Sequence, residues 1–493
     1  MKPITVVIPY SQDNSFYKTL FEFLKSEMTE EIFIISQKRV DVPVSGCRVL
    51  TGASILSKEV IDNVLKNVKT DYLLILAKYK HVVLEFDALG KLVETAISTK
   101  AGIIYPDFYD EKQEGRYIHP LNNYQPGSVR DDFDFGSMML FSVFAVMDVL
   151  DKYGPISDVK YAGLYDLRLK VSIGHSIYHK NSPIYSVFMK EEMQCGHENI
   201  FAYVDPENIF VQKEMETVFT DYLKKINAYL PPHNLKGAME SPEIFPVEAS
   251  VVIPVKNRRA TIGDALESAL SQETGFKFNV IVVDNHSADG TTAVLENFAK
   301  KHSSLKYISP SKTDLGIGGC WNEAIYSKIC GKYAVQLDSD DLYSSPHTLA
   351  KIVHMLREYN YAMVVGSYTI VNFDLETIPP GLIEHREWTE ENGYNNALRI
   401  NGLGAPRAFN TSVIRKIGFL NVSYGEDYAA ALRICREYRI GRIFENLYLC
   451  RRWSGNTDAV LEIDDRNCND AFKDMIRTEE ITARQKMNRE NTC

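Results

Sequence analysis

The clearest clue to the fold is "ASVVIPVKNRR" (residues 249–259), because a close copy, "ITVVIPYSQDN" (4–14), stands near the N-terminus. The run from Val6 to Pro9 matches the run from Val251 to Pro254. Short apolar strands of this kind are typical of parallel sheets buried on both faces. A repeated strand also raises the question whether the rest of the domain is repeated, since an internal duplication changes every later assignment.

Four further pairs of segments match in the same order. They are "EEIFIISQ" (30–37) with "KFNVIVVDN" (277–285), "DYLLILAKYK" (71–80) with "KYAVQLDSDD" (332–341), "GSMMLFSVFAV" (136–146) with "GAPRAFNTSVI" (404–414), and "YAGLYDLRLK" (161–170) with "YGEDYAAALR" (424–433). We therefore predict two copies of one domain. The predicted division is a first copy at 1–230, a linker at 231–246, a second copy at 247–460 and a mixed-charge helical tail at 461–493.

Short strands alternate with amphipathic helices in the second copy, which predicts a Rossmann-like α/β fold with a mostly parallel sheet. The expected elements are strands at 250–254, 279–283 and 333–337 and helices near 261–272, 291–301 and 320–330. In such sheets ligands bind beyond the carboxyl ends of the strands. Polar residues follow these ends and should face one cleft: Lys256, Asn257, Arg258, Asp284, Asn285 and the acidic run Asp338 to Asp341.

Bulk composition restricts the class of protein. The 493 residues are 45% hydrophobic and 24% charged, and the net charge of -10 argues against nucleic-acid binding, which needs a basic face. No apolar run is long enough to span a membrane, and the N-terminal apolar stretch is too short for a secretory signal. We expect a cytoplasmic protein, although peripheral membrane association is compatible with the sequence. Eight scattered cysteines without a CxxC pair indicate free thiols.

The second copy resembles a family 2 glycosyltransferase of the GT-A fold. The resemblance is carried by "VVIPVKNR", "VIVVDNHSADGT", "DLGIGGCWNEAI", "VQLDSDD" and "YGEDYAAALR", which stand in the family's order. It implies two tandem GT-A-like domains, the first of which resembles the family only through its weaker copy. It also implies a nucleotide-diphosphate sugar donor and a glycan or lipid-linked acceptor.

Asp338, Asp340 and Asp341 would repel one another without a cation. Hard divalent ions prefer oxygen ligands and keep places for water and phosphate, so the cluster suits Mn²⁺ or Mg²⁺ on a diphosphate. By similarity, Asp340 is the metal ligand and Asp338 contacts the metal or the ribose. A solvated acidic turn that caps a helix is the structural alternative for a lone DxD sequence.

The resemblance assigns the remaining donor contacts. It implies that Asp284 binds the base of the nucleotide and that the loop with Pro254, Lys256 and Asn257 lies near the nucleotide. It places Asn322 close to the donor, on a helix that follows the glycine-rich "DLGIGG". Strand-end turn chemistry is an equally simple account of Asp284.

The pair Glu426 and Asp427 opens a helix, where acidic side chains also suit the helix dipole. Similarity makes Asp427 the general base, supported by Glu426, in a single displacement that inverts the anomeric carbon. Many relatives have a metal-binding histidine in the motif that here reads "CRRWSGNTD" (450–458), so Trp453 puts that ligand in doubt. Arg452 is predicted to supply charge to the phosphates instead.

Each chemical position differs in the first copy. Ser36 stands opposite Asp284, Ala77 and Tyr79 stand opposite the metal-binding aspartates, and Gly163 and Leu164 stand opposite the catalytic pair. The first copy is therefore predicted to be a noncatalytic, degenerate glycosyltransferase-like domain.

Specificity for the acceptor is expected in the loop 379–396, where His385 and Trp388 are candidate contacts and a packed loop is the alternative. Two other functions stay open at the level of sequence. The first is a noncatalytic carbohydrate- or nucleotide-sugar-binding protein. The second is a sugar nucleotidyltransferase, although "PVKNRRAT" lacks the glycine-rich loop expected there.

Overall fold

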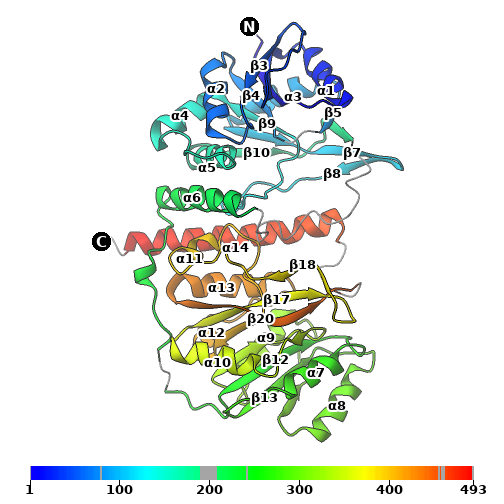
Figure 1. Cartoon of the computed structure of the whole chain (residues 1–493), viewed down its shortest axis with the longest axis vertical. Helices are drawn as coiled ribbons and strands as arrows, with labels where there is room; N and C mark the ends of the chain where they lie inside the picture. Colours follow the sequence, from blue (N-terminus) through cyan, green and yellow to red (C-terminus); the bar gives the residue numbers. More distant parts are fainter. Residues whose placement is uncertain are drawn as a thin grey trace. The chain divides into compact units, whose positions relative to one another are not determined.

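The computed structural model describes residues 2–77, 80–188, 208–239, 242–453, 456 and 461–490. The chain folds into two compact units (Figure 1). The first comprises the described residues of 1–200 and 207–229 together with those of 462–493, and the second comprises the described residues of 230–461. Each unit contains a mostly parallel sheet with helices, so the predicted α/β class is confirmed.

The first unit has a main sheet in the order β3-β2-β1-β4-β9-β6-β10 and a small sheet in the order β5-β11-β7-β8. Its strands are β1 (Ile4–Pro9), β2 (Thr29–Ser36), β3 (Cys47–Thr51), β4 (Tyr72–Leu76), β5 (His81–Leu84), β6 (Ile103–Pro106), β7 (Phe108–Lys112), β8 (Gly115–His119), β9 (Met138–Ser142), β10 (Ile177–Lys180) and β11 (Tyr185–Phe188). Its helices are α1 (Asn14–Leu24), α2 (Lys58–Asn67), α3 (Ala88–Thr99), α4 (Val143–Tyr153), α5 (Gly163–Gly174), α6 (Ile209–Lys225) and α14 (Ile463–Glu490).

The second unit has one sheet in the order β14-β13-β12-β15-β19-β17-β20-β16, with β18 paired to β17. Its strands are β12 (Ala249–Val255), β13 (Phe278–Asp284), β14 (Leu305–Ile308), β15 (Tyr333–Gln336), β16 (Leu342–Tyr343), β17 (Met363–Val371), β18 (Thr377–Ile383), β19 (Arg407–Asn410) and β20 (Ile440–Arg451). Its helices are α7 (Ile262–Leu270), α8 (Thr291–Lys301), α9 (Ile317–Ile325), α10 (Thr348–Glu358), α11 (Gly393–Asn396), α12 (Thr411–Ile417) and α13 (Glu426–Glu437), and a 3₁₀ turn spans Pro232–Asn234.

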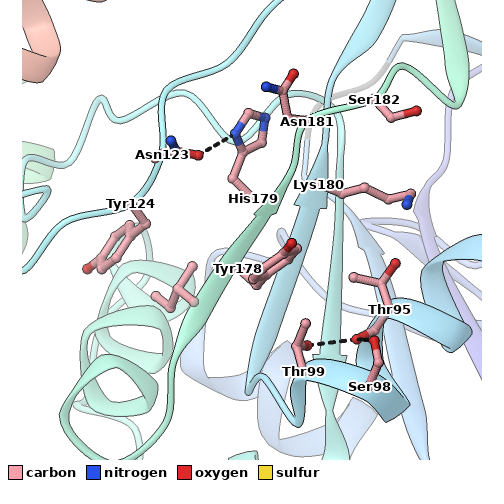
Figure 2. A pocket seen from close by; sticks show the side chains of 11 residues that line it. Thr95, Ser98, Thr99, Asn123, Tyr124, Tyr178, His179, Lys180, Asn181 and Ser182 are labelled. Atoms are coloured by element: carbon pink, nitrogen blue, oxygen red, sulfur yellow. Dashed lines mark hydrogen bonds between the residues drawn. The ribbon is translucent and has the colours of Figure 1, made fainter.

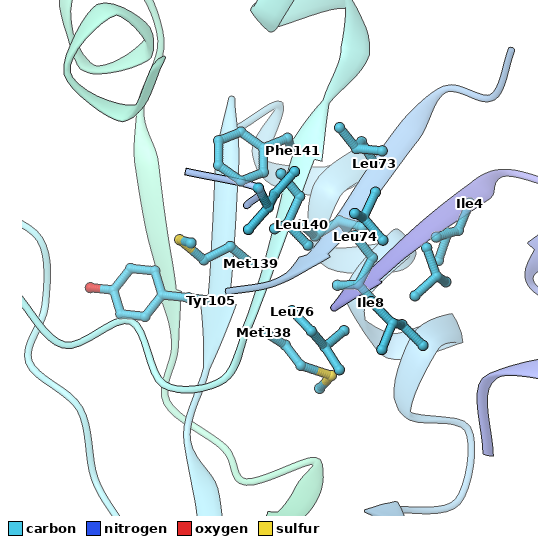
Figure 3. Close-up of a cluster of buried hydrophobic side chains, with 14 of the residues drawn as sticks. Ile4, Ile8, Leu73, Leu74, Leu76, Tyr105, Met138, Met139, Leu140 and Phe141 are labelled. Atoms are coloured by element: carbon cyan, nitrogen blue, oxygen red, sulfur yellow. The ribbon is translucent and has the colours of Figure 1, made fainter. Parts of the chain in front are cut away.

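Apolar strands form the core of each unit because side chains on both faces of the sheet are covered. In the first unit Ile4, Leu74 and Phe141, from β1, β4 and β9, are fully buried in one cluster (Figure 3). In the second unit Val251 and Val335, on β12 and β15, are fully buried in the same way. Burial of this area supplies the main favourable free energy of folding.

The two main sheets share strand order, direction and register. Read from one edge, β3-β2-β1-β4-β9-β6-β10 corresponds to β14-β13-β12-β15-β19-β17-β20, and in both sheets the fifth strand runs antiparallel to its neighbours. Val6 pairs with Ile32 and Leu74, as Val251 pairs with Val280 and Val335. A slip of one residue would have moved every side chain to the other face of the sheet.

Unusual backbone conformations also recur at matching positions. Gly136 and Gly404, just before β9 and β19, have φ of 68° and 97°, and Gly154 and Gly418, which end α4 and α12, have φ of 87° and 70°. Such positive φ values favour glycine. The Tyr165 hydroxyl on α5 donates to Val129 O at 2.5 Å. On α13, the Tyr428 hydroxyl donates to Ala397 O at 2.7 Å.

The C-terminal helix α14 belongs to the first unit, although most of the second unit precedes it in the chain (Figure 1). Ser128 Oγ donates to Asp474 Oδ2 at 2.8 Å, and Arg130 forms ion pairs with Asp470 and Asp474 at 3.1 and 3.4 Å. A side chain at Gly127 would place its Cβ 2.0 Å from Asp474 O, so only glycine allows this approach. The helix predicted in the tail is therefore present and is held by the loop before β9.

Most of the predicted elements of the second unit agree with the observed ones within about two residues, an ordinary discrepancy at element ends. The exception is the helix predicted at 320–330, which spans Ile317–Ile325 as α9. It begins three residues earlier, with Gly318 and Gly319 in its first turn, and ends five residues earlier, with Tyr326 as its C-cap. In the part of the chain that the structure describes, no helix is long and apolar enough to cross a bilayer.

Candidate active site

The acidic run follows the carboxyl end of β15, where the sequence predicts a binding cleft. Asp340 and Asp341 are buried, and Asp338 is half-buried. Gln336 Nε2 donates to both carboxylate oxygens of Asp338, at 2.9 and 3.0 Å. Burial raises the pKa of Asp338, and burial together with the neighbouring carboxylates raises the pKa of Asp341 well above its ordinary value. The acidic run therefore concentrates carboxylate groups at a site that is largely shielded from water.

Asp340 is surrounded by nitrogen donors. Trp453 Nε1 donates to Asp340 Oδ2 at 3.0 Å, and Asn456 Nδ2 donates to the same oxygen at 3.3 Å. Arg258 Nε lies 3.9 Å from this oxygen, and the Arg258 guanidinium lies 5.7 Å from the centre of the Trp453 ring. Phe373 packs edge-on against Trp453, with ring centres 5.4 Å apart. The residue at the position of the expected histidine therefore contacts the predicted metal ligand through an indole N–H.

Arg451 fixes the turn that carries the acidic run. Its backbone N–H donates to Asp341 Oδ1 at 2.8 Å, its Nε donates to Asp340 O, and its Nη1 pairs with Asp264 Oδ2 at 2.7 Å. The side chain is buried. Arg452, which was predicted to bind phosphate, donates its backbone N–H to Val371 O at 2.8 Å, and its contact with phosphate stays a prediction.

The pair Glu426 and Asp427 opens α13, as predicted. Arg407, on β19, forms an ion pair with Asp427. Although burial opposes its charge, the carboxylates of Asp427, Asp338 and Glu426 raise the pKa of Arg407. One guanidinium therefore interacts with both the acidic run and the pair on α13, which brings the two motifs into one site.

Glu426 and Asp427 occupy different environments. Glu426 is buried, and burial, with the Asp427 charge acting in the same direction, raises the pKa of Glu426 to about 8. The Asp427 side chain is 29% exposed and receives the Arg407 ion pair. Asp427 is therefore the carboxylate of the pair that an incoming hydroxyl can reach without displacing packed side chains.

Helix α9 sets the position of α13 through close backbone packing. A Cβ on Gly318 would lie 1.9 Å from Leu420 O, and Gly318 N–H donates to Val422 O at 3.0 Å. Asn322 Nδ2 donates to Phe419 O at 2.9 Å, and its Oδ1 accepts from Phe419 N–H at 3.0 Å. The "DLGIGG" stretch thus holds the segment that leads into Glu426. Both polar atoms of the Asn322 side-chain amide serve this packing, and a contact of Asn322 with the sugar donor stays a prediction.

The loop after β12 is tied to the loop after β13. Asp284 is buried, and its two carboxylate oxygens accept from Ser287 N–H at 3.1 Å and Thr292 Oγ1 at 2.5 Å. Asn257, with a φ of 54°, accepts at Oδ1 from Ala288 N–H at 2.8 Å. The predicted donor residues Pro254 and Lys256 lie on or directly after β12, half-buried and exposed respectively. These residues share the edge of the sheet that carries the acidic run.

The two candidate acceptor contacts are both buried. His385 is 1% exposed, with its Nδ1 2.7 Å from Glu387 Oε1, and burial lowers the pKa of His385. Trp388 is 5% exposed and packs edge-on against Tyr394 at 5.3 Å between ring centres. The packed-loop alternative describes this geometry, so contact with an acceptor stays a prediction that requires the loop to open.

Sequence reasoning missed Arg407 and the Trp453 contact with Asp340. Arg407 carries a signal in the sequence, because the matching position of the first copy is Met139, on a strand that is otherwise apolar. A cation in a central strand needs an acidic partner. The contact between Trp453 and Asp340 joins residues 113 positions apart, and nothing in the local pattern indicates it.

The donor set suits a hard cation shared with a ligand. The described residues contain no group of three or more His, Cys, Asp or Glu side chains placed to hold a metal by themselves. Asp338 and Asp340 do offer carboxylate oxygens, and Mg²⁺ is often held by one or two carboxylates together with substrate phosphates. The residues therefore fit an ion that a diphosphate helps to bind.

Comparison with known proteins finds similarities to part of the second unit. Residues 250–418 match the family model described as Glycosyl transferase family 2. A putative glycosyltransferase of Bacillus subtilis, EpsE, is 30% identical over 124 residues, which is 25% of this chain and 44% of the relative. A poly(ribitol-phosphate) beta-glucosyltransferase of Bacillus spizizenii is 24% identical over 47% of this chain and 36% of the relative. The chain thus spans less than half the length of these relatives.

Solved structures include a similar chain, residues 1–349 of S. aureus TarS in complex with UDP-GlcNAc. The identity is 21%, the TM-score is 0.37, and the match covers 48% of this chain and 71% of the TarS chain. A mannosyltransferase of Pyrobaculum calidifontis, PcManGT, in complex with GDP-Man and Mn²⁺, matches with 19% identity and a TM-score of 0.33 over 49% of this chain and 66% of the other.

Proposed function

We propose that the second unit, in which residues 250–418 match the family model for family 2 glycosyltransferases, transfers a sugar from a nucleotide-diphosphate donor to an acceptor hydroxyl in glycan or polysaccharide biosynthesis. The observation that carries the proposal is the position of Arg407, which pairs with Asp427 and interacts with Asp338. A single site thus contains carboxylates suited to a diphosphate-bound cation and a carboxylate suited to proton transfer.

The reaction is a single displacement at the anomeric carbon. The acceptor oxygen forms a bond to this carbon while the bond to the leaving diphosphate breaks, and the hydroxyl proton passes to the Asp427 carboxylate. Attack from the face opposite the leaving group inverts the configuration. The ion pair with Arg407 orients the Asp427 carboxylate, and the buried Glu426 supports the first turn of the helix.

Asp340 and Asp338 would hold Mn²⁺ or Mg²⁺ together with the diphosphate. A bound ion of this kind supplies Lewis-acid stabilisation of the negative charge that develops on the leaving group. Arg258 adds a fixed positive charge 3.9 Å from Asp340 Oδ2. Asp284 is proposed to bind the nucleotide base, since it closes β13 at the same edge of the sheet.

We further infer that the first unit is a noncatalytic copy of the same domain. The shared register of the sheets, the matching glycines and the Tyr165 and Tyr428 contacts support this inference. At the position of Glu426, a Cβ on Gly163 would lie 2.6 Å from Leu56 O, and Leu164 is buried. Ser36 and Ala77 carry no carboxylate, and Tyr79 lies outside the described residues.

A donor screen tests the proposed function. The full chain is incubated with Mn²⁺ and a panel of nucleotide sugars, and released nucleoside diphosphate and pyrophosphate are measured separately. The proposal expects nucleoside diphosphate from at least one donor, and loss of this release in Asp340→Ala but not in Asp374→Asn, an exposed aspartate of the same unit. Pyrophosphate would indicate a nucleotidyltransferase, and donor binding without release of either product would indicate a noncatalytic binding protein.

A further inference from the structure

The first unit contains a pocket of about 600 Å³ between the last turns of α3 and the edge strand β10 (Figure 2). This volume lies within the usual range for small-molecule sites. The lining is mainly hydroxyl and amide groups, with the Tyr178 ring and the Lys180 ammonium. The hydroxyl and amide groups belong to Thr95, Ser98, Thr99, Asn123, Asn181 and Ser182.

Two aromatic rings line this pocket, and Tyr124 is packed against Phe133 and Phe135. Tyr178 is 43% exposed, and no ring or cation contact covers its ring among the described residues. The matching strand of the second unit has Gly441 at this position, because Ile177 pairs with Ile103 as Ile440 pairs with Met363. The strand architecture therefore does not require a large side chain here.

In the second unit the corresponding space is closed by the protein itself. A Cβ on Gly441 would lie 2.4 Å from the ring of Tyr361, which is 9% exposed. Tyr359 stacks on this ring at 5.6 Å and Arg439 lies 5.7 Å from its centre. The backbone of Lys236 pairs with that of Tyr438, next to Arg439, in an isolated parallel β-bridge.

The residues that cover the Tyr361 ring in the second unit are replaced by small residues in the first unit. Lys100 and Asn360 are the matching residues with φ of 55° and 52° after α3 and α10, so Thr99 corresponds to Tyr359. By the pairing of β10 and β20, Ser176 corresponds to Arg439. The first unit therefore lacks the stacked group that fills this space in the second unit, and the small Thr99 lines the pocket instead.

A buried network holds one wall of the pocket. His179 is 9% exposed, with its Nε2 2.7 Å from Asp107 Oδ1 and its Nδ1 2.9 Å from Asn123 Oδ1 (Figure 2). Leu121 N–H also donates to Asp107 Oδ1, at 2.8 Å. The amide of Asn123 is therefore held in place before any ligand binds, which lowers the entropic cost of recognition.

The charge and polarity of the lining define the ligand. The hydroxyls of Thr95, Ser98 and Thr99 donate to carbonyls of α3, so they can accept hydrogen bonds from sugar hydroxyls. The amide groups of Asn123 and Asn181 can supply donors, and an open aromatic ring suits the apolar face of a pyranose. Lys180 lines the pocket, and its ammonium forms no ion pair with an acidic side chain in the described parts of the chain. An unneutralised ammonium favours a carboxylate or a phosphate on the ligand.

We propose that this pocket binds an acidic carbohydrate, with a sugar ring on Tyr178 and the acidic group on Lys180. The ligand class rests on the proposed function, since a glycan on which the second unit acts would be held by the first. The noncatalytic copy thereby gains a role in retaining the acceptor or the product.

The test measures binding to the full chain on a printed array of carboxylated, phosphorylated and neutral oligosaccharides, followed by titration calorimetry with the strongest binder. We expect acidic oligosaccharides to bind above neutral ones, and Tyr178→Ala and Lys180→Gln each to weaken binding about tenfold. Tyr117→Ala is the matched control, because Tyr117 is 48% exposed in the same unit and does not line the pocket. Unchanged melting temperatures would show that the variants are folded.

The proposal is overturned if acidic oligosaccharides do not bind, if neutral ones bind as well, or if Tyr178→Ala and Lys180→Gln bind like wild type. Nucleoside diphosphate release is measured on the same variants with the donor alone. If wild type releases nucleoside diphosphate but binds no acidic oligosaccharide, or if Tyr117→Ala loses binding as much as Tyr178→Ala, only the assignment of this pocket is contradicted. Absence of release with array binding retained contradicts only the transferase assignment.

Discussion

Replacement of Trp453 by phenylalanine should tighten the binding of Mn²⁺ to the complex with a nucleoside diphosphate such as UDP. In the structure the Trp453 indole N–H donates to Asp340 Oδ2 at 3.0 Å, so this oxygen must give up a hydrogen bond before it can coordinate an ion through the same lone pair. A hydrogen bond to a charged group contributes about 1.5 to 3 kcal/mol. Its removal from the metal-free state corresponds to an increase of about 10- to 150-fold in affinity.

Phenylalanine keeps the aromatic contacts of Trp453, since a ring remains under Arg258 and against Phe373. The assay is titration of Mn²⁺ by electron paramagnetic resonance at constant UDP, which reports the free ion independently of turnover. Phe373→Leu is the control, because it changes the packing of Trp453 but not a hydrogen bond to Asp340. Equal or weaker binding of Mn²⁺ by Trp453→Phe than by wild type would refute the competition between the indole and the ion.

Three further predictions concern stability and can be checked by urea denaturation. The pKa of Glu426 is raised from 4.5 to about 8. The free energy of unfolding of wild type should therefore fall relative to that of Glu426→Gln as pH rises from 4.5 to 8, by about 1.4 kcal/mol per pH unit. Parallel pH profiles of the two proteins would contradict this prediction. Burial lowers the pKa of His119, but the carboxylates of Asp110, 2.7 Å from Nδ1, and Asp134, 3.7 Å from Nε2, raise it to about 9. His119→Gln should therefore cost stability at pH 6 and much less above pH 9, and an equal cost at both would exclude the ion pairs as its cause. Gly318→Ala should lose about 2 kcal/mol or more, since its Cβ would lie 1.9 Å from Leu420 O, whereas Gly263→Ala, with open space around its Cβ, serves as the tolerant control.

The positions of the strands were accessible from the sequence because they depend on local apolar runs. The match of Val6 with Val251 placed β1 and β12, and the acidic run was correctly expected at the carboxyl end of β15. The pair Glu426 and Asp427 was likewise placed at a helix start, since acidic residues in a first turn are a local signal.

Contacts between residues distant in sequence were not accessible in this way. Arg407 joins the two motifs from β19, and Trp453 reaches Asp340 from beyond β20, through geometry that only the folded sheet creates. The association of α14 with the first unit depends on Arg130 and Asp474, which no periodic pattern connects. The burial of Trp388 reflects the packing of Tyr394 against it, a contact that decides between the exposed and packed forms of the loop that the sequence left open.

The most direct test of the account is the comparison of Asp427→Asn with Asp374→Asn in sugar transfer from the active donor at saturating Mn²⁺. Asparagine preserves the shape of the side chain but cannot accept the proton of the acceptor hydroxyl, so the account predicts a loss of kcat of at least about 100-fold with little change in donor affinity. Asp374→Asn should transfer sugar like wild type. Transfer by Asp427→Asn at the wild-type rate would contradict the assignment of the general base and, with it, the proposed mechanism.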